Sequence, residues 1–209
     1  MNTLAGYLRQ AGTALRFLLF ATLVLGLAYP LAVFGTGQLI APYQANGSIL
    51  KDSAGAPAAS ALIVQAAAND SGVQDPRWFH ARPSAAKWDP ASSSPSNLGP
   101  NDSKLLEAVT ANRSAVAAAE GVDPATVPAD AVTASGSGLD PDISPEYARV
   151  QTARVAAANG LGADAVASLV EQHTSSGLVA FLGRPSVNVT ALNLAVAAAA
   201  RPSQPAQSK

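Results

Sequence analysis

The sequence predicts a mixed α+β domain that follows a single N-terminal transmembrane helix. Three observations support this fold class. Residues 17–50 contain no charged side chain, and their first part is almost entirely apolar. Further along the chain, capping residues mark the ends of several helices. Short apolar segments between these helices are typical of buried strands, although their order in a sheet stays open.

The apolar run Phe17–Phe34 is the basis of the transmembrane prediction. A helix rises about 1.5 Å per residue, so roughly 20 residues cross a hydrocarbon core of about 30 Å. We therefore expect a span over residues 16–37. Gly26 and Pro30 would weaken a soluble helix, whereas a membrane helix tolerates them where neighbouring helices satisfy the freed backbone groups. Both residues favour a span that packs against other membrane helices.

The charges on either side of the span predict its orientation. Arg9 and Arg16 precede the apolar run, and the first charge after it is Lys51. The positive-inside tendency then keeps the short N-terminus in the cytoplasm and exports the rest, which in a bacterium means to the periplasm or the cell exterior. A cleaved signal peptide is the alternative, because Gly26 and Ala28 are small residues at a potential cleavage site. The apolar run continues past them, which favours a retained anchor.

These observations divide the chain into five parts, with one domain of ordinary size. In chain order, we expect a cytoplasmic N-terminus (1–15), the transmembrane helix (16–37), a juxtamembrane linker (38–61), an extracytoplasmic α+β domain (62–200) and a flexible tail (201–209). Residues 41–61 within this linker region are rich in small residues and proline, and could also form an irregular first strand.

Cap and turn residues predict the elements of the domain. Helices are expected over residues 103–120, 145–159, 163–173 and 190–200, the first two beginning after polar caps and ending before glycine. Strand candidates are residues 62–64, 131–134, 178–182 and 186–189. Residues 78–100 mix aromatic residues with repeated proline and serine, which is typical of a long functional loop.

Composition excludes several classes of function. The chain has no cysteine, which removes disulfides, thiolate metal sites and thiol nucleophiles. Its net charge is −1, and from residue 17 onward 11 basic residues stand against 14 acidic ones. This balance gives nucleic acid no electrostatic footprint. The two histidines, His80 and His173, lie far apart in the sequence and do not predict a metal site.

Two short motifs could carry chemistry, and each has a simpler interpretation. The turn Ser135–Asp140 (SGSGLD) could present backbone N–H groups to a phosphate, but it lacks the third glycine of a dinucleotide fingerprint and favours a plain turn. Ser84 and Lys87 match the SxxK motif of penicillin-binding proteins. A second match at Ser48 and Lys51 shows how little information this pattern carries, so a serine hydrolase is a weak alternative.

Four segments follow the apolar run in order: Phe79–Ser84 (FHARPS), Ser96–Pro100 (SNLGP), Val127–Pro141 (VPADAVTASGSGLDP) with Ile143–Pro145, and Phe181–Leu194 (FLGRPSVNVTALNL). Together with the single span, they resemble the C subunit (KdpC) of the Kdp-type potassium-transporting ATPase of bacteria and archaea. The resemblance covers nearly the whole chain, except for the linker and the tail.

The resemblance implies a non-catalytic subunit of a high-affinity, ATP-driven potassium uptake complex in the bacterial inner membrane. Its implied partners are the channel-like KdpA-type protein, the KdpB-type P-type pump that hydrolyses ATP, and a small single-span KdpF-type protein. Family members are described as stabilising the complex and as catalytic chaperones that raise the affinity of the pump for ATP. The resemblance implies no cofactor of the chain's own, since ATP would be met through the complex.

Nucleotide contact in this family is linked to a glutamine in the helix after SGSGLDP, which corresponds here to Gln151. By the same resemblance, the residues of the preceding turn are candidates for nucleotide binding, namely Ser135, Gly136, Ser137 and Gly138. The predicted topology opposes this role, because it places Gln151 outside the cytoplasm, where ATP is scarce. An extracytoplasmic lid over the ion entrance, without a nucleotide role, is therefore the alternative.

Overall fold

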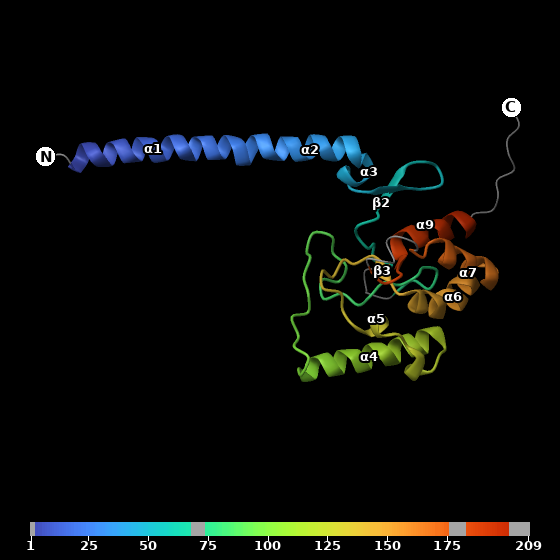
Figure 1. Cartoon of the computed structure of the whole chain (residues 1–209). Helices are drawn as coiled ribbons and strands as arrows, with labels where there is room; N and C mark the ends of the chain where they lie inside the picture. Colours follow the sequence, from blue (N-terminus) through green and yellow to red (C-terminus); the bar gives the residue numbers. More distant parts are fainter. Residues whose placement is uncertain (1–2, 68–73, 176–182, 201–209) are drawn as a thin grey trace, which may run out of the picture. The chain divides into compact units, whose positions relative to one another are not determined.

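The computed structural model describes residues 3–67, 74–175 and 183–200. The chain divides into two compact units, Met1–Ser48 and Ile49–Lys209, which we describe separately. The first unit is dominated by one helix of 38 residues, Thr3–Ile40, formed by α1 (Thr3–Leu23), a π-helical stretch η1 (Val24–Ala28) and α2 (Tyr29–Ile40) (Figure 1). In the described part of the chain, this is the helix long and apolar enough to cross a membrane.

The long helix extends beyond both ends of the predicted span of residues 16–37. At about 1.5 Å per residue its 38 residues measure roughly 57 Å, almost twice the thickness of a hydrocarbon core. None of its residues is buried against the rest of the chain. The helix therefore has additional turns at its N-terminal end, residues 3–15, which carry Arg9.

A π-helical stretch interrupts the regular hydrogen bonding of this helix next to Pro30. The N–H of Tyr29 donates to the carbonyl of Val24, five residues earlier instead of four. Pro30 has no N–H to offer Gly26, and its ring crowds the carbonyl four residues before it, so the helix widens at this point. The side chain of Gly26 is a single hydrogen, which leaves a notch beside Thr22, whose Cγ2 would lie 3.8 Å from an added Cβ.

The predicted linker contains regular structure. A single helical turn, α3 (Pro42–Ala45), follows the long helix, and the hairpin of β1 (Ile49–Lys51) and β2 (Pro57–Ser60) opens the second unit. The carboxylate of Asp52 accepts hydrogen bonds from the N–H groups of Ala54 and Ala56 and closes the hairpin loop. The sequence allowed residues 41–61 to be either a linker or an irregular first strand, and the hairpin agrees better with the strand.

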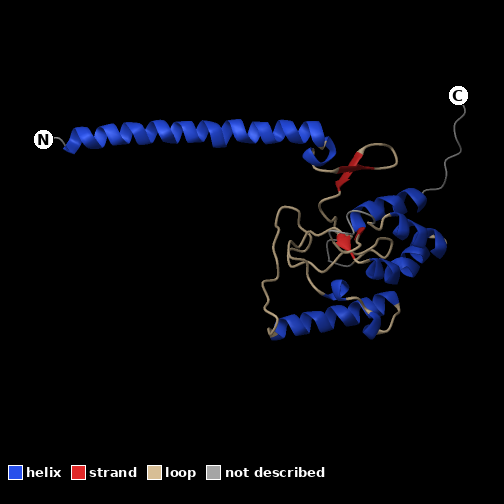
Figure 2. Ribbon diagram, in the orientation of Figure 1, coloured by secondary structure: helices blue, strands red, loops and turns tan. Residues whose placement is uncertain are grey.

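The second unit is built mainly of helices (Figure 2). The predicted helices are confirmed as α4 (Ser103–Glu120), α6 (Pro145–Asn159), α7 (Ala163–Gln172) and α9 (Val189–Ala200). The first two, α4 and α6, have the predicted polar N-caps and glycine ends. Asp102 accepts from the N–H of Lys104, Ser144 accepts from the N–H of Tyr147, and Gly121 and Gly160 both end their helices with a φ of 66°.

Two strand predictions are wrong. Residues 131–134 were expected as a strand, but Ala131 and Val132 belong to the helical turn α5 (Ala129–Val132), which Pro128 introduces. Residues 62–64 form a turn, and Val64 makes a single backbone hydrogen bond to Leu139. Val64, Ala131 and Val132 are apolar and buried, and burial does not distinguish short strands from other buried backbone.

The strands that do form are short. Within the predicted segment 186–189, Val187–Asn188 forms β4, which pairs antiparallel with β3 (Asp142–Ile143). The candidate at residues 178–182 lies outside the described residues. Each described strand has two to four residues and belongs to a two-stranded antiparallel sheet. The mixed α+β composition is therefore confirmed, with helices in the larger share.

The core of the second unit lies where α6, α7 and α9 meet. Val155, Val166, Val170, Leu192 and Val196 come from these helices, and each is no more than 2% exposed. Phe79, from the long loop, is fully buried in the same cluster. Short side chains dominate this core, so stability depends heavily on polar contacts that fix the loops to the helices.

Candidate functional site

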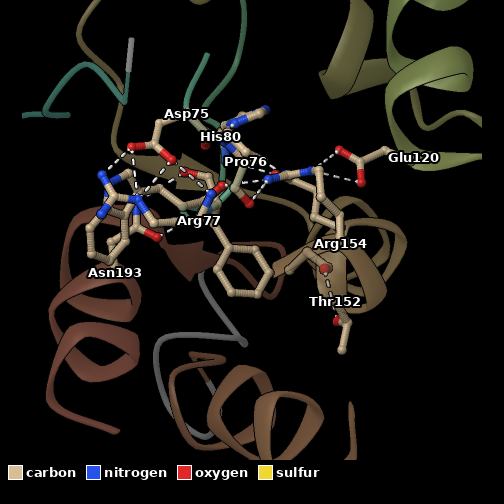
Figure 3. A network of polar contacts seen from close by, with 12 residues as sticks. Asp75, Pro76, Arg77, His80, Glu120, Thr152, Arg154 and Asn193 are labelled. Atoms are coloured by element: carbon tan, nitrogen blue, oxygen red, sulfur yellow. Dashed lines mark hydrogen bonds and ion pairs between the residues drawn. The ribbon is translucent and has the colours of Figure 1, made fainter. Parts of the chain in front are cut away.

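Residues 76–80, which we call the docked segment, have no regular structure and are held by side chains from α6 and α9 (Figure 3). All five carbonyls accept a hydrogen bond from such a side chain. The pairs are Pro76 with Arg154 (2.6 Å), Arg77 with Asn159 (2.7 Å), Trp78 with Arg154 (2.9 Å), Phe79 with Asn193 (3.0 Å) and His80 with Gln151 (3.0 Å). Side chains of the two helices thereby supply the hydrogen bonds that a neighbouring strand would supply in a sheet.

Two carboxamides hold both backbone groups of the residue that they contact. Gln151 accepts from the N–H of His80 at 2.6 Å and donates to its carbonyl. Asn193 does the same for Phe79, accepting from its N–H at 2.8 Å. A carboxamide carries one acceptor and an NH₂ donor, so it can pair with a peptide group as another peptide would. The side chain of Gln151 is consequently part of the core, with no exposed surface.

Arg154 connects the docked segment to α4. Its Nε lies 3.0 and 3.1 Å from the two carboxylate oxygens of Glu120, whose side chain is only 2% exposed. Nη1 donates to the docked segment, and Nη2 donates to Gln151 at 2.8 Å. Burial raises the pKa of Glu120, while the charge of Arg154 opposes this shift. This ion pair is therefore costly to break from either side.

His80 contributes a buried imidazole beside this network. Its Nε2 lies 3.0 Å from the carbonyl of Asp75, an acceptor, so the neutral ring carries its proton on Nε2. Burial, together with the charge of Arg154, lowers the pKa of His80 to about 4. The imidazole is therefore neutral at physiological pH. This state suits a packed residue better than a general base that must accept a proton near pH 7.

The lowered pKa of His80 predicts how acid affects stability. The unfolded chain takes up a proton near pH 6.5, whereas the folded chain resists protonation down to about pH 4. The contribution of neutral His80 to the free energy of unfolding is therefore complete above pH 6.5. It is lost as pH falls from 6.5 to about 4, by up to about 3 kcal/mol. We expect urea unfolding monitored between pH 7.5 and 4 to show this loss. The variant His80→Asn should lack this part of the dependence, and an unchanged profile in that variant would contradict the assignment.

The glycine turn Ser135–Asp140, for which the sequence favoured a plain turn over a phosphate site, packs against the chain itself. Ser135 is buried and donates its N–H to the carbonyl of Pro83, and the carbonyl of Ser137 accepts from Ser94. At Gly138, whose φ is 70°, an added Cβ would lie 2.8 Å from the carbonyl of Ser94. Gly138 is thus required for close packing of the turn on the loop before α4.

The structure does not bring the glycine turn and Gln151 together into one site. Gly136 and Ser137 are exposed at the tip of the turn, while Gln151 faces the docked segment. Among the described residues, no hydrogen bond joins the two groups. The assignment of either to nucleotide contact stays a prediction from the family resemblance.

Ser84, the proposed nucleophile of the SxxK motif, has a structural role. Its hydroxyl donates to the carbonyl of Gly138 at 2.7 Å and accepts from the N–H of Trp88 at 3.0 Å. Its proton is therefore held by a carbonyl that cannot act as a base. Lys87 is exposed, with a φ of 52°. Among the described residues, no three side chains of His, Asp or Glu are grouped to hold a metal ion.

A pocket of about 490 Å³ lies between α4 and the docked segment. Trp88 with alanines and prolines supplies most of its apolar lining, and the polar lining comes from Gln74, His80, Asn112, Glu120, Tyr147 and Arg154. Sequence reasoning did not identify this pocket or the roles of Asn193, Asn159, Arg154 and Glu120. The one available signal was that Asn193 falls within a segment that carried the family resemblance.

Residues 11–198 match the family described as "KdpC: K+-transporting ATPase, c chain". The chain belongs to the KdpC family. It is 52% identical over 199 residues to the potassium-transporting ATPase KdpC subunit of Kineococcus radiotolerans, covering 94% of this chain and 97% of that one. The corresponding KdpC subunit of Caulobacter vibrioides is 47% identical over 178 residues, which are 84% of this chain and 86% of the relative.

A third relative extends the comparison to Pseudomonas aeruginosa. Its KdpC subunit is 45% identical over 190 residues, covering 90% of this chain and 97% of its own. The family match includes most of the long helix as well as α4, α6, α7 and nearly all of α9. The resemblance inferred from the four sequence segments is thereby confirmed.

Proposed function

We propose that this chain is a non-catalytic, single-pass subunit of a potassium-transporting ATPase complex. The match to the KdpC family over residues 11–198 carries the proposal, because it joins the long apolar helix and the second unit in one family. The relatives are named as KdpC subunits of a potassium-transporting ATPase. The partners would be proteins of the KdpA, KdpB and KdpF types, with ion passage assigned to the first and ATP hydrolysis to the second.

The contacts of the polar residues support an accessory role. Ser84, Gln151 and Asn193 use their side chains to fix loop backbone, and Glu120 is paired with Arg154. A side chain that is engaged in these hydrogen bonds or in this ion pair is not free to act on a substrate. The notch at Gly26 and the widened turn before Pro30 support packing of the anchor against membrane helices of partner subunits.

Within this function, we favour an extracytoplasmic domain that assembles the complex and covers the ion entrance. Arg9 and Arg16 precede the apolar run and the first charge after it is Lys51, which supports export of the second unit. An excess of negative charge also raises the local cation concentration modestly. The membrane would be the bacterial inner membrane, with the N-terminus in the cytoplasm.

Protease access tests the orientation. We expect trypsin added to spheroplasts to cut the exposed sites at Lys51 and Arg77 of the full complex, and to leave them intact in sealed inside-out vesicles. As the matched control, an engineered cleavage site in the N-terminal segment should show the opposite pattern. Cleavage at Lys51 or Arg77 only in inside-out vesicles would reverse the proposed topology.

The catalytic-chaperone role implied by the family is the second candidate. It would place Gln151, and the turn residues Ser135, Gly136, Ser137 and Gly138, in contact with a nucleotide. In the present conformation Gln151 has no exposed surface and holds the backbone of His80, so nucleotide contact would require those bonds to break. Calorimetric titration of the full chain with ATP tests this role directly, and saturable binding would support it.

A further inference from the structure

We infer that the pocket between α4 and the docked segment binds a small, neutral, largely apolar molecule that ends in a hydroxyl or N–H donor. Its volume of about 490 Å³ lies within the range of roughly 300–1,000 Å³ that is common for small-molecule sites. The indole of Trp88, with Pro83 and Ala119, gives it apolar walls. These walls suit the body of the ligand and the polar lining selects its end group.

Tyr147 supplies the first polar group without a partner. Its side chain lines the pocket, and the residue is only 3% exposed. Its hydroxyl makes no hydrogen bond to any described residue, although a buried tyrosine normally finds one. Burial, reinforced by the charge of Glu120, raises the pKa of Tyr147, so the hydroxyl stays neutral and can donate or accept. A hydroxyl that opens into the pocket without a partner among the described residues is free to pair with a ligand.

Glu120 and His80 add acceptors to the same pocket. Both carboxylate oxygens of Glu120 share the single Nε proton of Arg154, which leaves most of their lone pairs unused. The neutral ring of His80 donates from Nε2 to Asp75, so its Nδ1 is an acceptor, and no described residue donates to it. The unused capacity of Glu120 and His80 is for accepting hydrogen bonds, so a ligand group that reaches them must donate.

The charges in the pocket favour a neutral ligand. Glu120 and Arg154 balance one another, so a cationic ligand would meet the guanidinium as well as the carboxylate. An anion or phosphate would find only one unengaged N–H on Arg154, the second proton of Nη2, because its other four protons are taken by protein acceptors, and it would also meet the carboxylate of Glu120. An alcohol, a phenol or an amide N–H with an apolar body remains as the matching chemistry.

The test compares p-cresol with toluene, which has a similar ring but no donor. The full chain is used in lipid nanodiscs, since detergent would compete for an apolar pocket, and binding is followed by ligand-detected NMR. We expect p-cresol to bind about fivefold to tenfold more tightly than toluene, the worth of one hydrogen bond. Tyr147→Phe should reduce this ratio to about twofold.

A pair of variants on α4 locates the binding. Ala119 lines the pocket, whereas Ala118 is an exposed neighbour that does not. We expect Ala119→Leu to weaken p-cresol binding at least tenfold by filling the pocket, and Ala118→Leu to leave it within twofold of the unmodified chain. Absence of saturable p-cresol binding, equal affinity for toluene, or equal effects of the two leucine variants would overturn the inference.

Discussion

Replacing Gln151 by alanine should lower the free energy of unfolding by about 3–5 kcal/mol. The substitution leaves the N–H and the carbonyl of His80 buried without partners, at roughly 1–3 kcal/mol each, and adds a cavity beside Arg154. The two tryptophans of the chain, Trp78 and Trp88, both lie in or near the docked segment. Urea unfolding followed by tryptophan fluorescence therefore reports on this region even in the full chain.

Thr152→Ala is the matched control for this variant. Thr152 is the next residue of α6, and its hydroxyl donates only to the carbonyl of Ala148 within the same helix (Figure 3). We expect its loss of stability to be about 1 kcal/mol or less. A similar small loss for Gln151→Ala would show that the docked segment is held by its other contacts. Loss of ATP binding at unchanged stability would instead favour the nucleotide role of Gln151.

Removing the guanidinium in Arg154→Met should cost about 3–5 kcal/mol, and the cost should depend on pH. The carbonyls of Pro76 and Trp78 lose their donor, and the carboxylate of Glu120 stays buried without its partner. Without Arg154, nothing offsets the burial that already raises the pKa of Glu120. The folded state then favours the protonated acid, so the penalty is largest at high pH and shrinks as pH falls.

Unfolding curves for Arg154→Met at pH 8 and pH 5.5 check this expectation. The loss relative to the unmodified chain should be smaller at pH 5.5, where part of the folded population carries a protonated Glu120. Adding Glu120→Gln to Arg154→Met removes the buried charge and should recover part of the stability at pH 8. If the double variant is no more stable than the single one at pH 8, the buried carboxylate is not the source of the loss.

The sequence was sufficient to predict the helices because their signals are local. Ser144 and Pro145 begin α6 and Gly160 ends it, and all three can be identified without knowledge of the rest of the fold. The strands could not be predicted in the same way. Ala131 and Val132 are apolar and buried in the core, and that property is common to buried strands and helical turns.

The candidate site was only partly predictable, for a different physical reason. Gln151 was identified through the family resemblance, but its backbone partner, His80, lies 71 residues earlier. Asn193 contacts Phe79 across 114 residues, and no pattern in the sequence connects the two. The serine of the SxxK motif was visible as a motif, whereas its structural bond to Gly138 became apparent only from the packing of the loop on the turn.

The long separation between Phe79 and Asn193 also constrains how the domain is made. Contacts that close such large loops form late in folding, because the chain entropy that they remove is large. Asn193 is synthesised 114 residues after Phe79, so the segment around Phe79 has to wait for it. Until then the peptide groups of this segment and the phenyl ring of Phe79 are open to chaperones and proteases. Docking of α9, which carries Asn193, ends this exposure.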